Sequence, residues 1–214
     1  MRIFVTGATG FIGSATVREL IGAGHSVLGL ARSDAAAASL ENAGGDVHRG
    51  ALSDPASLVA GARACDGVIH TAFIHDFART TIAEAAVVDA RVVEALCAAL
   101  EGSGKALAIA SGTALLPAGR LVTEADVPVT GAPRGPSEAT IQAASDRGVR
   151  ANAVRLPPTV HGTGDHGFVP MLIDIARRTG VAAYVGDGTN RWPAVHRFDA
   201  ARVFRLTVET AASG

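Results

Sequence analysis

Short apolar runs alternate along the chain with longer segments whose apolar residues recur every three or four positions. This alternation is typical of βαβ units and predicts a parallel sheet with helices on both faces. Continuous apolar runs such as Val68-Ile69 and Leu107–Ile109 fit strands that are covered on both faces. The expected strands are Arg2–Thr6, Ser26–Ala31, Asp46–Arg49, Gly67–Ala72, Ala106–Ala110 and Ala151–Leu156.

Local signals mark the ends of the helices between these strands. Gly24 suits the position after a helix, and Asp54 before Pro55 suits the start of one. Two segments without periodicity, Ala114–Gly135 and Thr159–Gly167, are predicted to be long loops of the kind that often bind ligands. The expected helices are Phe11–Ala23, Asp34–Asn42, Pro55–Cys65, Thr81–Leu100, Pro136–Asp146 and Ala200–Thr210.

The order of these elements predicts an α/β fold with a doubly wound, Rossmann-type parallel sheet and the strand order 3-2-1-4-5-6. Residues 1–160 are expected to form the nucleotide-binding domain. Residues 161–214 are expected to add elements of a small substrate lobe, interleaved with the last part of that domain. No seventh strand follows the final helix, so we expect this lobe to be incomplete in the chain.

Composition narrows the class of protein. A net charge of -1 with scattered arginines argues against nucleic-acid or anionic-membrane partners. No apolar run reaches membrane-spanning length, and Met1-Arg2 leads directly into a strand rather than a signal peptide. Cys65 and Cys97 lack metal-ligand spacing and are expected to be buried free thiols. These features predict a cytoplasmic protein.

A glycine-rich segment, Thr6–Gly13, follows the first expected strand and opens the first helix. Gly7 permits a tight turn, Gly10 permits close approach of a diphosphate, and Gly13 permits close packing of helix on strand. The helix N-terminus then offers unpaired N–H groups to an anion. The sequence therefore predicts a dinucleotide site, the alternative being a glycine turn without a ligand.

The Gly-x-x-Gly-x-x-Gly spacing resembles the extended branch of the short-chain dehydrogenase/reductase superfamily, the NAD(P)-dependent epimerase/dehydratase family. The resemblance continues through Gly50–Asp54, Val68–Phe73, Ala110–Thr113, Arg155–Gly162 and Trp192–Asp199. These segments are similar to the family's adenine turn, ribose turn, catalytic strand end, nicotinamide turn and substrate-cleft segment. Cofactor contacts are thereby implied for Gly7, Thr9, Gly10, Phe11, Ile12, Gly13, Leu52, Thr71, Ala72, Phe73, Pro157, Thr159 and Val160.

The end of the second strand favours NADP over NAD. An NAD enzyme needs a carboxylate there for the ribose hydroxyls, but the chain has Arg32 and Ser33. Asp34 is better placed to cap the next helix. Arg32 can pair with a 2′-phosphate and Ser33 can add a hydroxyl; a solvent-facing arginine is the alternative.

The acid–base pair of the resembled family, Tyr-x-x-x-Lys, is missing. The chain has one tyrosine, Tyr184, and one lysine, Lys105, too far apart to form it. If Ser137-Glu138 occupies the family's Ser-Lys position, Arg134 replaces the tyrosine and Glu138 the lysine. Activity of the family's type would need another proton carrier.

Two polar residues at expected strand ends are candidates for this chemistry. Ser111 lies where the resemblance places a catalytic serine, the alternative being a strand-end cap. His75 follows the fourth strand, and the neighbouring Asp76 can orient or charge it; a surface loop without function is the alternative.

Asp89 interrupts the apolar stripe of the longest expected helix, where an ionised carboxylate is costly unless it is paired. The resembled family has an asparagine on this helix that holds a proton-relay water, and Asp89 is its candidate counterpart. A structural bond to the fifth strand is the alternative.

Other polar residues of the late loops are less specific. His161, His166 and His196 lack the helical spacing of known ligand sets, so no metal is expected. Trp192 is predicted either to wall a substrate pocket or to be a core aromatic residue.

Three functions fit the sequence. The first is an NADP-dependent oxidoreductase or epimerase that acts on a small carbonyl or hydroxyl compound with a non-standard proton donor. The second is a catalytically silent NADP(H)-binding sensor or scaffold protein. The third is a non-redox epimerase or dehydratase that retains its cofactor. The expected partner is a small-molecule substrate, and a homodimer is possible.

Overall fold

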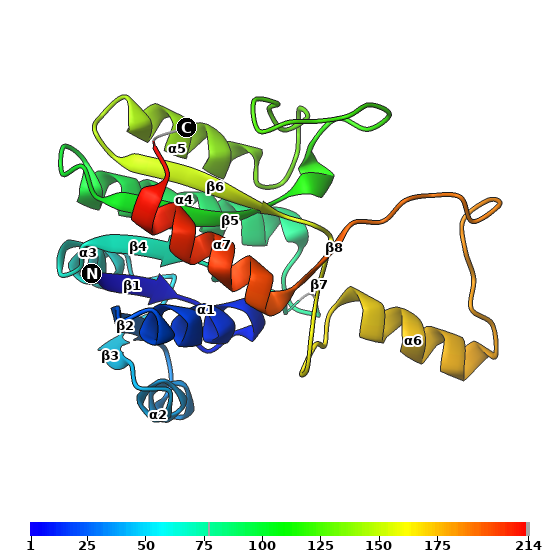
Figure 1. The fold of residues 1–214 in the computed structure, drawn as a ribbon, viewed down its shortest axis with the longest axis horizontal. Coiled ribbons are helices and arrows are strands. Elements are labelled where there is room, and N and C mark those ends of the chain that lie inside the picture. Colours follow the sequence, from blue (N-terminus) through cyan, green and yellow to red (C-terminus); the bar gives the residue numbers. More distant parts are fainter. Residues whose placement is uncertain (77, 213–214) are drawn as a thin grey trace.

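A computed structural model describes residues 1–76 and 78–212. Its main sheet is six-stranded and parallel in the order β3-β2-β1-β4-β5-β6, which confirms the predicted α/β class and strand order (Figure 1). The strands are β1 (Arg2–Thr6), β2 (Ser26–Ala31), β3 (Asp46–Arg49), β4 (Gly67–His70), β5 (Ala106–Gly112) and β6 (Arg150–Leu156).

Helices cover both faces of this sheet because neighbouring strand residues point to opposite sides. Phe4 of β1 packs in one core cluster with Leu58, whereas Ile3 packs in a second cluster with Leu20 and Phe204. The first cluster lies under α3, α4 and α5, and the second under α1, α2 and α7. The helices are α1 (Phe11–Gly22), α2 (Asp34–Asn42), α3 (Pro55–Arg63), α4 (Ile82–Leu100), α5 (Gly135–Ser145), α6 (Phe168–Thr179) and α7 (Arg197–Thr210).

The bounds of α2 agree with the sequence prediction, but its capping residue differs. Ser33, in extended backbone, is the N-cap, and its hydroxyl oxygen accepts a hydrogen bond from the backbone N–H of Ala36 at 3.3 Å. Asp34 is the first helical residue and forms an ion pair with Arg49 at 2.7 Å. The prediction that Asp34 caps this helix is therefore wrong, because the cap is the preceding residue, Ser33. Gly24, with φ +84°, follows α1 as predicted.

Two strands, one α-helix and the short 3-10 helix Thr113–Leu115 were not predicted. β7 (Thr159–His161) and β8 (Ala194–His196) pair in parallel as a separate two-stranded sheet, so the start of the predicted loop Thr159–Gly167 is a strand. Such short strands carry no usable alternation, and their partners are distant in sequence. Helix α6 extends away from the main sheet and contains no buried residue (Figure 1). Its sequence signal is the helical spacing of Phe168, Met171, Leu172 and Ile175.

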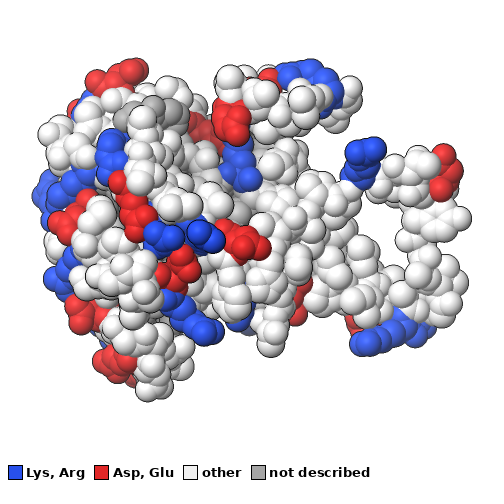
Figure 2. Space-filling view, in the orientation of Figure 1, with Lys and Arg blue, Asp and Glu red and all other residues white. Residues whose placement is uncertain are grey.

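The surface formed by α1 and α7 carries interspersed charges of both signs (Figure 2). Arg205 of α7 pairs there with Glu19 of α1 at 2.8 Å and with Glu209 at 2.7 Å. These pairs link the last helix of the chain to the first. Among residues 1–76 and 78–212, no helix is both long and apolar enough to cross a membrane.

Candidate functional site

The turn between β1 and α1 requires two of its three glycines for packing. Gly7 has φ +70°, and a Cβ there would lie 2.7 Å from the backbone nitrogen of Ala72. A Cβ on Gly13 would lie 1.9 Å from the carbonyl oxygen of Gly7. Gly10 differs, because its added Cβ would meet only the Gly7 carbonyl oxygen, at 3.2 Å. Gly10 therefore borders open space above the turn.

The first turn of α1 is free to receive an anion. Its N-cap, Gly10, provides no side-chain hydrogen bond, and no acidic residue lies in the first turn. Helix N-terminal N–H groups without such partners bind phosphate, and the helix dipole favours the negative charge. The open position at Gly10 and the uncapped helix fit the diphosphate of a dinucleotide. The sequence prediction for Thr9, Phe11 and Ile12 concerns this same turn.

The residues predicted to bind the adenosine end lie at the end of β2. Arg32 is exposed, and no carboxylate of the described residues pairs with it. Ser33 uses its oxygen as an acceptor in the α2 cap, which leaves its hydroxyl hydrogen available for a phosphate. Leu52 packs against the core at its half-buried position. No carboxylate occupies the position directly after β2.

The turns after β4 and β6 are held by side-chain hydrogen bonds. Thr71 donates to the carbonyl oxygen of Thr6 at 2.9 Å, which fixes the backbone leading to Ala72 and Phe73. Thr159 accepts from Trp192 Nε1 at 2.7 Å. In the sequence prediction, this turn also includes Pro157 and Val160.

Trp192 is not a core residue. It is 50% exposed and stacks on Phe168 with ring centroids 5.1 Å apart. Its indole N–H is satisfied by Thr159, so one edge of the ring is fixed while a face stays accessible. The core alternative for Trp192 is wrong, and the pocket-wall alternative stays a prediction.

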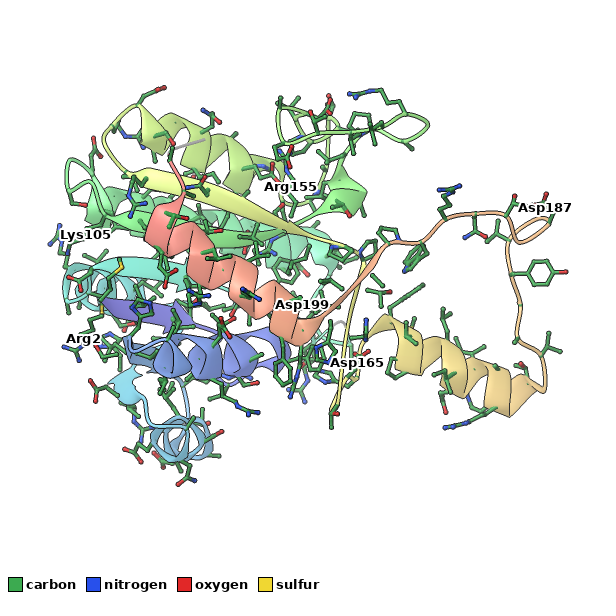
Figure 3. The ribbon with its side chains drawn as sticks, in the orientation of Figure 1. Arg2, Lys105, Arg155, Asp165, Asp187 and Asp199 are labelled. Atoms are coloured by element: carbon green, nitrogen blue, oxygen red, sulfur yellow. The ribbon has the colours of Figure 1, made fainter. Side chains whose placement is uncertain are left out.

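Neither the tyrosine nor the lysine of the chain reaches the carboxyl ends of the strands. Lys105 lies just before β5, at the other end of the main sheet from Arg155, and its Nζ donates to the carbonyl oxygen of Cys65 at 2.7 Å (Figure 3). Tyr184 is 74% exposed in the segment after α6. Both are therefore remote from any site at that sheet edge.

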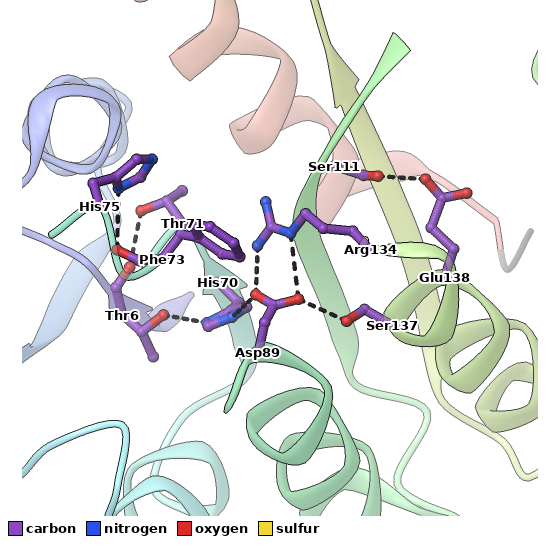
Figure 4. A network of polar contacts seen from close by, with 10 residues as sticks. All are labelled: Thr6, His70, Thr71, Phe73, His75, Asp89, Ser111, Arg134, Ser137 and Glu138. Atoms are coloured by element: carbon purple, nitrogen blue, oxygen red, sulfur yellow. Dashed lines mark hydrogen bonds and ion pairs between the residues drawn. The ribbon is translucent and has the colours of Figure 1, made fainter. Parts of the chain in front are cut away.

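A buried carboxylate, Asp89 of α4, is the centre of a polar network at this edge (Figure 4). Its Oδ1 accepts from His70 Nε2 at 3.2 Å and from Arg134 Nη2 at 2.5 Å. Its Oδ2 accepts from Ser137 Oγ at 2.6 Å and from Arg134 Nε at 3.3 Å. Four donors occupy the roughly four acceptor sites of a carboxylate. The alternative of a bond to the fifth strand is wrong, because the partners come from β4, α5 and the residue before α5.

The network keeps Asp89 ionised. Burial alone opposes the charged form, but the hydrogen bonds from His70 and Arg134 and the positive charge of Arg134 outweigh it and hold the pKa of the Asp89 carboxyl well below its usual range. An ionised carboxylate only accepts, so His70 Nε2 carries a hydrogen. His70 Nδ1 lies 2.6 Å from Thr6 Oγ1, which connects the network to the residue before Gly7.

A second buried carboxylate, Glu138, lies beside Ser111. Ser111 at the end of β5 donates its hydroxyl hydrogen to Glu138 Oε1. Arg155 of β6 donates to the same carboxylate through Nη2 at 2.7 Å and Nε at 3.2 Å. The single hydroxyl hydrogen of Ser111 is thus directed at Glu138, and its lone pairs are left for another partner.

Arg134 lies between the Ser111–Glu138 pair and the segment that contains Phe73 and His75 (Figure 4). Its guanidinium stacks over the Phe73 ring at 4.7 Å, and Nη1 points away from Asp89. His75 Nδ1 donates to the Phe73 carbonyl oxygen at 3.1 Å, because a carbonyl oxygen can only accept. Asp76, predicted to orient His75, forms its ion pair with Arg79 at 3.9 Å. The carbonyl of Phe73 therefore supplies this orienting contact.

Burial lowers the pKa of His75 below its ordinary value of 6.5. The bond to the Phe73 carbonyl opposes this lowering of the pKa, while the positive charge of Arg134 adds to it. At neutral pH the imidazole of His75 is accordingly mostly uncharged.

Sequence reasoning missed His70 and Arg155 as members of these networks. Each is a polar residue between apolar neighbours near the carboxyl end of a strand. That position could have indicated a site residue, because open α/β sheets bind ligands at this edge. The three histidines of the late loops take no part in these hydrogen-bonded networks. His161 of β7 and His196 of β8 pack edge-on, with ring centroids 5.4 Å apart. The His166 ring packs edge-on against Phe11, with ring centroids 6.1 Å apart. No group of three metal-ligating side chains occurs in the described part of the chain.

Comparison with known proteins identifies the family. The sequence profile of the NAD dependent epimerase/dehydratase family matches residues 3–214. The chain belongs to this family. The resemblance in the glycine-rich segment therefore extends over the whole chain, and the family's usual Tyr-x-x-x-Lys pair is absent from this member.

Individual relatives agree with this assignment. An uncharacterised protein of Schizosaccharomyces pombe is 53% identical over 216 residues, which cover 100% of this chain and 72% of that protein. A 2-alkyl-3-oxoalkanoate reductase of Stenotrophomonas maltophilia is 30% identical over 226 residues, covering 100% of this chain and 67% of that enzyme. The structure of MoeE5 in complex with UDP-glucuronic acid and NAD superposes with a TM-score of 0.76 at 25% identity, covering 100% of this chain and 74% of MoeE5. Family and relatives support an NAD(P)-dependent oxidoreductase or epimerase activity.

Proposed function

We propose that this chain is an oxidoreductase that prefers NADP(H) and interconverts a small carbonyl compound and its alcohol. The main support is the position of the Arg134 guanidinium, which is fixed by Asp89 and Phe73 at the carboxyl ends of β4 and β5. Open α/β sheets bind ligands at this edge. The reductase relative from Stenotrophomonas maltophilia favours carbonyl reduction over the other activities of the family.

Bound NADP(H) would supply or accept the hydride. Arg134 would act on the substrate oxygen, because Nη1 is directed away from Asp89 and offers an N–H to a carbonyl. A guanidinium does not release its proton near neutral pH, so its role would be to stabilise negative charge on that oxygen. Asp89 would be a positioning residue, since its acceptor sites are filled by protein donors.

Ser111 would take part as a hydrogen-bond acceptor. Its hydrogen is directed at Glu138, so a substrate hydroxyl can donate to the free lone pairs of its oxygen. This arrangement suits the alcohol form of the substrate. For the carbonyl form, Arg134 would be the donor, because the Ser111 hydrogen is directed at Glu138.

His75 would deliver the proton that the reduced carbonyl oxygen needs, so we expect kcat to be highest at acidic pH. The imidazolium is the donor, and it is populated only below a pKa that lies under 6.5. The kcat for reduction should therefore decline as pH rises through that pKa and be low at neutral pH. The dependence of kcat on pH in the unaltered protein and in His75→Gln tests this prediction. His166→Gln is the control, in which the decline of kcat with rising pH should remain. If the decline persists in His75→Gln, another group delivers the proton.

The unaltered protein should bind NADPH at least about tenfold more tightly than NADH, a difference of about 1.4 kcal/mol. The reason is the exposed Arg32, which has no carboxylate partner among the described residues and would pair with the 2′-phosphate. Calorimetry on Arg32→Asp should show this ratio narrowed or reversed. Arg49→Ala is the control, because Arg49 is already paired with Asp34. Equal affinities for the two cofactors before any substitution would contradict the preference.

Steady-state assays with NADPH and a panel of aldehydes, ketones and 3-oxoacids test the proposed function. Oxidation of NADPH with matching alcohol formation supports it. Cofactor binding without turnover of any substrate favours a sensor or scaffold protein, which the absent Tyr-x-x-x-Lys pair already suggests. Epimerisation or dehydration without net NADPH consumption indicates the non-redox alternative. The division at residue 160, the cytoplasmic location and the homodimer stay predictions.

A further inference from the structure

Arg197 is the arginine at the glycine-rich turn, although it is far from that turn in sequence. It is the first residue of α7, whose start lies beside the start of α1 (Figure 1). Its guanidinium carbon lies 5.1 Å from the ring centroid of Phe11, the first residue of α1. The segment Gly7–Gly13 contains no lysine or arginine of its own.

Aromatic rings hold this guanidinium in place. Its carbon lies 5.1 Å from the Phe198 ring as well as from Phe11, and such contacts stabilise a cation by about 0.5–1 kcal/mol at exposed sites. The stem is also confined, because a Cβ on Gly162 would lie 3.2 Å from Arg197 Cγ. The side chain is thus preorganised before any ligand binds.

The hydrogen-bonding groups of Arg197 lack protein partners within the described residues. Its Nε is buried without an acceptor, and no carboxylate there forms an ion pair with it. The other arginines placed against the core differ, since Arg134 pairs with Asp89 and Arg155 with Glu138. A fixed cation without a counter-ion, beside an uncapped helix N-terminus, suits a bound anion.

We propose that Arg197 binds the diphosphate of the dinucleotide cofactor, together with the N–H groups at the start of α1. This inference rests on the proposed cofactor and adds a residue from the last helix to its site. The diphosphate is common to NADPH and NADH, so Arg197 sets the affinity for both. Arg32, at the other end of the site, distinguishes between them.

Arg197→Met keeps the stem that packs on Gly162 and removes only the charge. Calorimetry should show the affinities for NADPH, NADH and ADP-ribose all weakened by about tenfold, since ADP-ribose retains the diphosphate and lacks nicotinamide. The NADPH-to-NADH ratio should stay as in the unaltered protein, in contrast to Arg32→Asp. Arg197→Lys should recover part of the affinity.

Arg202→Met is the matched control, because Arg202 is exposed on the same helix, and it should leave all three affinities unchanged. Thermal unfolding of each variant checks that α7 remains docked. Unchanged ADP-ribose binding in a folded Arg197→Met protein, or a loss confined to NADPH, overturns the inference. Failure of the unaltered protein to bind any of the three ligands contradicts the proposed cofactor itself, which is a separate result.

Discussion

Arg134→Met should lower kcat for carbonyl reduction by about 10²–10³-fold, the usual cost of removing one donor that stabilises a developing oxyanion. The guanidinium is held between the Asp89 carboxylate and the Phe73 ring, with Nη1 directed outward. Methionine retains the stem but offers no N–H. Affinity for NADPH should change little, because Arg134 does not lie at the glycine-rich turn. Single-turnover kinetics with calorimetric cofactor binding measure the two effects separately.

The same substitution also leaves Asp89 buried without its main counter-ion, so stability must be measured beside activity. Breaking a buried pair typically costs about 3–5 kcal/mol. Arg134→Lys is the matched variant, because it restores a charge near Asp89 without the two-nitrogen geometry of arginine. If Arg134 acts on the substrate, kcat stays low in Arg134→Lys even where the melting temperature recovers, and added guanidinium ion raises the kcat of Arg134→Ala. A kcat that follows stability across all these variants would assign Arg134 a purely structural role.

The replacement of the usual tyrosine and lysine is balanced by new partners. Arg134 is paired with Asp89, and Glu138, four residues later, is paired with Arg155. A lysine at position 138 would place a cation beside Arg155, and a tyrosine at 134 would leave Asp89 short of a positive partner. The two pairs therefore form a self-consistent alternative to the family's acid–base pair rather than an isolated loss.

Much of the fold was predictable because its central strands are largely apolar runs that alternate with helical segments. The bounds of β1, β2 and β3 agree with the sequence prediction, and a glycine directly follows β1 and β3. β4 is shorter than predicted, ending at His70, because Thr71 turns to donate to Thr6. Strand β7 was missed because a strand of three residues carries no usable alternation, whereas helix α6 was missed although its apolar residues recur at helical spacing.

The candidate site was only partly predictable. Asp89 was identifiable as a carboxylate on the apolar stripe of a helix, which implies that it must be paired. Ser111 was identifiable from its place at the carboxyl end of a strand and from the family resemblance. Their partners were not identifiable, because Arg134 and Glu138 reach them only after α5 docks against α4 and β5. A sequence can thus indicate that a buried carboxylate needs a cation, while the tertiary fold selects which arginine supplies it.

Gly10→Val should abolish detectable NADPH binding while leaving the protein folded. Gly10 has φ -75° and ψ 176°, an extended conformation that suits valine, and its Cβ would meet only the Gly7 carbonyl oxygen. The added side chain would instead fill the space through which a diphosphate approaches α1. Gly13→Ala is the contrasting variant, because its Cβ would lie 1.9 Å from that same oxygen and must displace the turn. Calorimetry and thermal unfolding should therefore separate the two: binding alone is lost in Gly10→Val, and binding and stability fall together in Gly13→Ala. NADPH affinity within about twofold of the unaltered protein in Gly10→Val, a difference of only ~0.4 kcal/mol, would show that the diphosphate binds elsewhere.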